Sequence, residues 1–175
     1  MKRFLGLATI VLAMSLGGLA HATEVGGSRT FGLGFQFPAP TAITAKLFIG
    51  GGNALDFGLG FGAPNYYHCR DVPDYTCGSV GRYISVHADY LWQENLIRQN
   101  GFKLDWHIGA GARLAVQNAF RGAYPELIAR MPLGADLTFA RPRFLEVFIE
   151  LAPGIMIVPP LYFALDVVIG VRFYF

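Results

Sequence analysis

Three residues in one short segment carry the side chains that nucleophilic catalysis uses. Ser85, His87 and Asp89 are spaced two apart, so on a β-strand they share one face, with neighbouring Cα atoms about 6.5 to 7 Å apart. A catalytic triad needs successive hydrogen bonds of about 2.6 to 3.2 Å, which this spacing alone does not provide. We therefore expect the three side chains, with His107 on the next strand, to belong to an interior polar network and not to an active site.

Two cysteines lie close together in a polar segment that is rich in turn-forming residues. Cys69 and Cys77 suit a small loop closed by a disulfide in an oxidising compartment. Closing so short a loop contributes about 2 to 3 kcal/mol. A metal site that includes His68 is the alternative, but it lacks a second pair of ligands. We expect the disulfide, and we expect neither a metal nor a cofactor.

The N-terminus has the pattern of a secretory signal peptide. A basic start is followed by an apolar stretch and by the small-x-small tripeptide of residues 20–22. A membrane anchor is the alternative, but the apolar stretch is short for a spanning helix. We expect residues 1–22 to be cleaved off. Lys2 and Arg3 leave with them, and the remaining chain has equal numbers of basic and acidic side chains, so it has no general attraction for nucleic acid.

The composition and the periodicity of the remaining chain point to β-structure. Apolar residues make up 53% of the sequence and charged residues only 15%, against about a quarter in soluble domains. No stretch after residue 22 is long and apolar enough for a spanning helix. Apolar residues instead recur at every second position, and in residues 102–114 every charge falls on one face.

This alternation recurs in eight segments, an even number, as a closed bacterial antiparallel barrel requires. A length of about 9 to 11 residues per strand is enough to cross the hydrocarbon layer, and 16-stranded porins are excluded by chain length. The expected strands cover residues 30–37, 43–50, 55–61, 83–93, 102–114, 127–139, 145–157 and 161–175.

The direction of the apolar face decides between two kinds of barrel. A secreted lipocalin-like carrier has its apolar face inside, whereas a membrane barrel has it outside. Scarce charges, glycines on the polar face, aromatic residues towards the strand ends and an aromatic C-terminus all favour the membrane arrangement. The sequence thus predicts an all-β chain whose residues 23–175 form an eight-stranded antiparallel up-and-down transmembrane β-barrel.

The signal peptide, the eight strands and the final Phe175 resemble the small outer-membrane barrels of the OmpA-like superfamily. Residues 145–154 and 169–175 look more specifically like the C-terminal half of a family of small porin-like barrels. The resemblance implies location in the outer membrane, contact with its lipid, and recognition of Phe175 by the barrel-insertion machinery. Outer-membrane lipid A deacylases use Ser and His on such a barrel, but theirs face the lipid, whereas alternation places Ser85 and His87 inside.

The inward face defines the candidate functional residues. A salt-bridged plug is one interpretation, because an eight-stranded interior is only just wide enough for side chains to fill. A narrow, weakly cation-selective water path is the other, because the inward glycines leave room. The inward charged and polar residues are Lys46, Asp56, Ser85, His87, Asp89, Lys103, Asp105, His107, Arg113, Arg130, Asp136, Glu146, Glu150, Asp166 and Arg172.

These observations favour a non-enzymatic, monomeric outer-membrane barrel with a structural or narrow porin-like role. The sequence leaves open whether small solutes, or a surface ligand at the loop of Cys69 and Cys77, are partners. We do not expect nucleic acid as a partner. The two alternatives are an outer-membrane lipid-modifying enzyme and a secreted lipocalin-like binding barrel.

Overall fold

The computed structural model describes residues 25–62, 82–119, 122–158 and 162–175. The expected signal peptide, residues 1–22, lies outside this part, as do Cys69 and Cys77 with the loop that contains them. Within it the chain is all-β, with strands joined in antiparallel pairs. The expected all-β fold class and antiparallel pairing are therefore confirmed for the described residues.

Nine strands are present in the described residues where the sequence predicts eight. They are β1 (Phe31–Ala39), β2 (Ala42–Gly50), β3 (Asn53–Gly62), β4 (Arg82–Arg98), β5 (Phe102–Ala119), β6 (Gly122–Arg130), β7 (Leu133–Phe139), β8 (Leu145–Val158) and β9 (Tyr162–Tyr174).

The additional strand arises because the segment expected at residues 127–139 is divided into β6 and β7 at Met131 and Pro132. Proline has no N–H to donate to a neighbouring strand, so the hydrogen-bond ladder is interrupted at this point. The backbone nevertheless remains held here: Gly109 N–H donates to the Pro132 carbonyl over 2.8 Å, and Met131 N–H to the Pro153 carbonyl over 2.9 Å. Both pieces pair with β5 on one side and β8 on the other, so together they occupy one position in the sheet.

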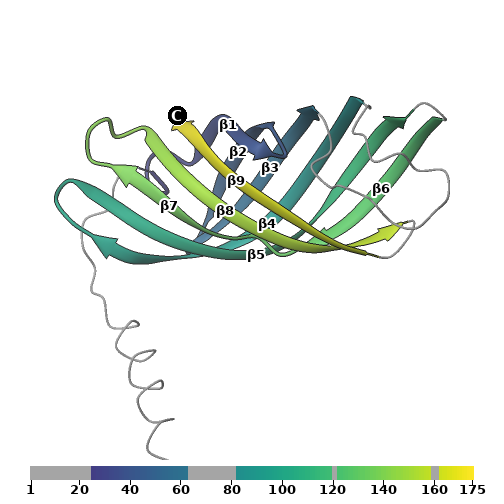
Figure 1. The fold of residues 1–175 in the computed structure, drawn as a ribbon. Helices are drawn as coiled ribbons and strands as arrows, with labels where there is room; N and C mark the ends of the chain where they lie inside the picture. Colours follow the sequence, from purple (N-terminus) through teal and green to yellow (C-terminus); the bar gives the residue numbers. More distant parts are fainter. Residues whose placement is uncertain (1–24, 63–81, 120–121, 159–161) are drawn as a thin grey trace, which may run out of the picture.

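Each of the nine strands is paired on both sides. The pairings run β4–β3–β2–β1–β9–β8, continue from β8 to β6 and β7 and from these to β5, and return through β5–β4. The first and last strands meet in the register Gly34 opposite Arg172. In Figure 1 the yellow strand β9 accordingly lies close to the purple strand β1. Pairing of this kind leaves none of these strands with an open edge that would invite association with another chain.

Burial follows the alternation, but the usual order of a soluble domain is inverted. On β9, Phe163 is 64% exposed and Leu165 is 45% exposed, whereas the charged residues Asp166 and Arg172, which follow them, are buried. The same holds on β4, where Ile84 and Val86 are exposed while Ser85, His87 and Asp89 are buried. Of the described residues, none lies in a helix long and apolar enough to traverse a bilayer.

Candidate functional site

The charged and polar residues predicted to face inward gather on the buried face of the sheet. Each of the fifteen is 5% exposed or less, except Lys103, whose side chain is 15% exposed. They come from every strand except β1, which contributes Gly32 and Gly34 and the buried amide of Gln36 to this face. The period-two pattern therefore brings together side chains that are up to 128 residues apart in sequence.

Arg172 on β9 is the centre of the first group of contacts. Its Nη2 donates to both carboxylate oxygens of Asp56, over 2.8 and 2.9 Å, and its Nη1 donates to Glu146 over 3.0 Å. The same guanidinium donates to the Thr44 hydroxyl and lies 3.8 Å above the ring of Phe148. One cation thus serves two carboxylates and stacks on an aromatic face, as the planar guanidinium of arginine allows.

Asp136 on β7 collects the second group. Lys46 Nζ lies 2.9 Å from its Oδ2, His107 Nδ1 lies 2.7 Å from the same oxygen, and the Gln93 amide donates to it over 2.6 Å. Lys46 Nζ also lies 3.8 Å from Glu146, which joins this group to that of Arg172. Tyr174 also belongs to the group of Arg172, because its hydroxyl donates to Glu146 over 3.0 Å.

Arg130 on β6 forms the third group. It contacts three carboxylates: it donates to Glu150, its Nη1 lies 3.3 Å from Asp166, and its Nε lies 3.4 Å from Asp89. Arg113 shares Asp166 with it. His107 Nε2 lies 3.4 Å from Glu150, so the second and third groups are connected through His107.

The three groups therefore make one continuous network across the buried face of the sheet. Charges in a low-dielectric interior are costly unless they are paired, and removal of one partner from a buried pair destabilises by about 3 to 5 kcal/mol. The network links strands across the buried face, because most of its ion pairs join strands that are not consecutive along the chain. Its chemistry is that of mutual neutralisation between buried charges.

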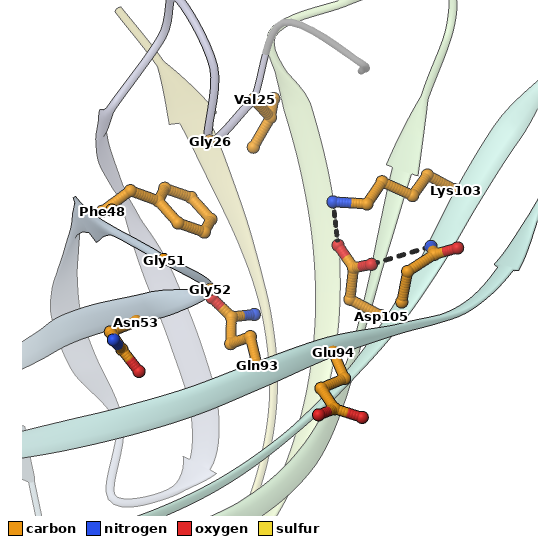
Figure 2. A pocket seen from close by; sticks show the side chains of 12 residues that line it. Val25, Gly26, Phe48, Gly51, Gly52, Asn53, Gln93, Glu94, Lys103 and Asp105 are labelled. Carbon is orange, nitrogen blue, oxygen red and sulfur yellow. Dashed lines mark hydrogen bonds and ion pairs between the residues drawn. The ribbon is translucent and has the colours of Figure 1, made fainter. Parts of the chain in front are cut away.

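A pocket of about 250 Å³ lies at the end of the sheet where β2 turns into β3. Figure 2 shows Phe48 on one side of it and Lys103 with Asp105 on the other. Lys103 Nζ lies 2.6 Å from Asp105, to which the Asn95 amide also donates over 2.9 Å. Gln93 lines the same pocket and reaches Asp136 from it. The pocket is thus in contact with the charged network at this end of the sheet, through Gln93.

Ser85, His87 and Asp89 do not form the hydrogen-bonded chain of a triad. Within the described part of the chain, neither the Ser85 hydroxyl nor either ring nitrogen of His87 has a hydrogen-bond partner, and the same is true of both Asp89 oxygens. This agrees with the expectation of an interior position. The expected hydrogen-bonded network does not include Ser85 and His87, however, and Asp89 takes part only through its ion pair with Arg130.

Four members of the network are absent from the residues singled out in the sequence. They are Thr44, Gln93, Phe148 and Tyr174, and all four have the inward parity of their strands. That parity is the signal that would have found them.

Phe175, the expected insertion signal, is 69% exposed, and its N–H donates to the Phe31 carbonyl over 2.8 Å.

Comparison of the chain with protein-family models, with curated proteins and with solved structures finds no match. The functional interpretation therefore depends on the geometry of the sheet and its buried network.

Proposed function

We propose that this protein is an integral outer-membrane β-barrel with eight strand positions, one of which is shared by β6 and β7. The observation that carries the proposal is the inversion of burial: large apolar side chains cover the outside while lysine, arginine, aspartate and glutamate fill the inside. Water-facing surfaces need charge, whereas a lipid-facing surface needs apolar side chains on strands whose backbone is fully paired. The two-sided pairing of every described strand meets the second requirement.

The role that the interior supports best is structural and non-enzymatic. A salt-bridged network that spans the buried face links the strands to one another, and an eight-stranded interior is only just wide enough for side chains to fill. The inverted burial does not favour a lipocalin-like carrier, because such a carrier needs an apolar interior. The missing hydrogen bonds of Ser85, His87 and Asp89 do not favour a lipid-modifying enzyme either. Location in the outer membrane and insertion through Phe175 follow from the expected signal peptide and the aromatic final strand.

The proposed plug predicts that the purified protein is silent in a planar bilayer. The interior charges are paired and buried, so an ion would have to break several contacts to pass. We expect no conductance steps under conditions where an open porin of known conductance gives them.

A narrow pore is the competing role, and one pair of variants separates the two. Glu150 lies in the network, whereas Glu94 is exposed and lines the pocket at the end of the sheet, outside the network. Steps whose ion selectivity changes in Glu150→Gln but not in Glu94→Gln would overturn the plug and place the conducting path through the network.

A further inference from the structure

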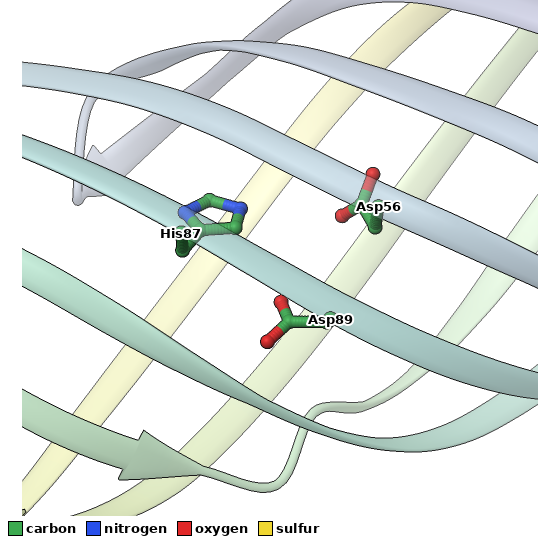
Figure 3. Close-up of side chains that lie close together, drawn as sticks. All are labelled: Asp56, His87 and Asp89. Carbon is green, nitrogen blue, oxygen red and sulfur yellow. The ribbon is translucent and has the colours of Figure 1, made fainter.

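One cluster on the buried face has bonding capacity that the charged network leaves unused. Asp56 on β3 and His87 and Asp89 on β4 each offer a ligand atom, and these atoms all lie within 4.8 Å of one another. Figure 3 shows a ring nitrogen of His87 directed towards the two carboxylates, which come from neighbouring strands.

His87 has the most unused bonding capacity in this cluster. Its ring is only 4% exposed, and neither nitrogen has a hydrogen-bond partner among the described residues. An unsatisfied buried polar group is destabilising by about 1 to 3 kcal/mol, and native proteins rarely leave one without a reason. A neutral imidazole with a free nitrogen lone pair is also the commonest metal ligand in proteins.

The two carboxylates are a second reason to expect a cation in this cluster. Asp56 and Asp89 lie directly opposite each other in the β3–β4 register, where like charges repel. Asp105 and Asp136 form a similar pair between β5 and β7, but each has a cation within 3 Å, Lys103 or Lys46. Asp56 likewise has Arg172 Nη2 at 2.8 Å, but among the described residues Asp89 has only Arg130 Nε, at 3.4 Å, and no hydrogen bond to either oxygen.

Glycines hold this cluster in position. Gly58 lies opposite His87, and a Cβ there would come within 2.1 Å of the imidazole. Gly111 lies opposite Asp89, and a Cβ there would come within 2.0 Å of Oδ1. The imidazole and the carboxylate therefore lie flat against neighbouring backbone that only glycine provides.

The charge balance of the buried face favours a cation in this cluster. The fifteen inward residues include seven carboxylates but only five lysines and arginines, so negative charge remains in excess even when His107, which lies between Asp136 and Glu150, carries a sixth positive charge. A cation in the cluster would offset this excess, and its attraction would be strong in a buried, low-dielectric site.

We propose that Asp56, His87 and Asp89 bind a divalent first-row transition-metal ion of the zinc type. One imidazole nitrogen and two carboxylates form a mixed set that suits zinc and its neighbours better than Mg²⁺ or Ca²⁺, which take oxygen ligands. Ligand atoms around tetrahedral zinc are about 3.4 Å apart, so the side chains close on the ion by movements of about 1 Å. Arg172 donates to both oxygens of the Asp56 carboxylate and Thr44 to one of them, and outer partners of metal ligands commonly hold a ligand in this way. The ion would tie β3 to β4 inside the barrel.

The test is to refold the purified protein with equimolar Zn²⁺, remove unbound metal and measure the zinc that remains. Loading during folding means that the buried site need not admit the ion afterwards. We expect about one zinc per chain, a fall of tenfold or more in bound zinc for His87→Ala and for Asp89→Asn, and no displacement by millimolar Mg²⁺.

Two matched controls separate this cluster from other sites. Ser85→Ala removes a side chain from the same strand and face without touching a proposed ligand, and it should retain the zinc. The triple variant His68→Ala, Cys69→Ser, Cys77→Ser removes the alternative metal site considered for the loop of Cys69 and Cys77, and it should retain the zinc too.

A spectroscopic measurement makes the test independent of variants that fail to fold. Co²⁺ bound by the wild-type protein should show visible d–d absorption without the charge-transfer band of cobalt–thiolate bonds. No bound metal in the folded wild type, binding unchanged in folded His87→Ala, or a thiolate band would each overturn the proposal. These readouts do not depend on membrane insertion or on conductance, so the proposed function can fail without the metal site failing.

Discussion

Replacement of Arg172 by methionine is expected to lower the free energy of unfolding by about 3 to 5 kcal/mol. The guanidinium is 1% exposed and serves both Asp56 and Glu146. Methionine fills part of the volume but leaves two buried carboxylates without their main partner. Urea unfolding of the protein in lipid vesicles, followed by tryptophan fluorescence, measures the change.

A charge-matched variant tells whether the lost pairing is the cause. Addition of Asp56→Asn and Glu146→Gln to Arg172→Met removes the orphaned charges, so the triple variant should be more stable than Arg172→Met alone. Exposed Glu94→Gln should change stability by less than about 0.5 kcal/mol. If Arg172→Met were as stable as the wild type, the network would not hold the fold.

Gly34→Ala is expected to prevent closure between β1 and β9. A Cβ at this position would come within 1.8 Å of the Val171 carbonyl oxygen and 2.8 Å of the Arg172 Cα. Both are backbone atoms, so no side-chain rotation relieves the overlap, and the loss should reach or exceed the upper end of the usual overpacking range of about 1 to 3 kcal/mol. The fraction that refolds in detergent, scored by the faster migration of folded barrels in unheated gels, checks this.

Gly101→Ala is the matched control for the closing seam. A Cβ at Gly101 meets nothing within 4 Å, so this change should leave the refolded fraction unaltered. Equal refolding of Gly34→Ala and Gly101→Ala would mean that the β1–β9 pairing is not required for the folded state.

The faces of the strands could be predicted from the sequence because strand side chains alternate with a period of two. Parity alone assigns Lys46, Asp136 and Arg172 to the inward face, and all three are buried. The division at Pro132 was not predicted, because alternation continues across it and only the backbone ladder is interrupted. The extension of β4 to Arg98 was also missed, because a register shift between Asn95 and Ile97 breaks the pattern there.

The partners within the network could not be predicted, because alternation gives the face of a side chain but not its reach across the enclosed space. The register neighbour of Lys46 is Asp56, yet its Nζ contacts Asp136, which is 90 residues away. Asp56 instead binds Arg172, 116 residues away. Likewise the spacing of Ser85, His87 and Asp89 suggests one linked group, while the fold places Asp56 beside His87 and Asp89 as the third member.

The central claim is that the apolar face contacts lipid, and the two tryptophans of the chain report on it directly. Trp92 and Trp106 are 50% and 37% exposed, and both lie on the apolar face. In vesicles made with brominated acyl chains, we predict that the tryptophan fluorescence of the wild-type protein is strongly quenched, while aqueous iodide quenches it weakly. Full fluorescence in the brominated vesicles together with strong iodide quenching would contradict the account, because the apolar face would then lie in water.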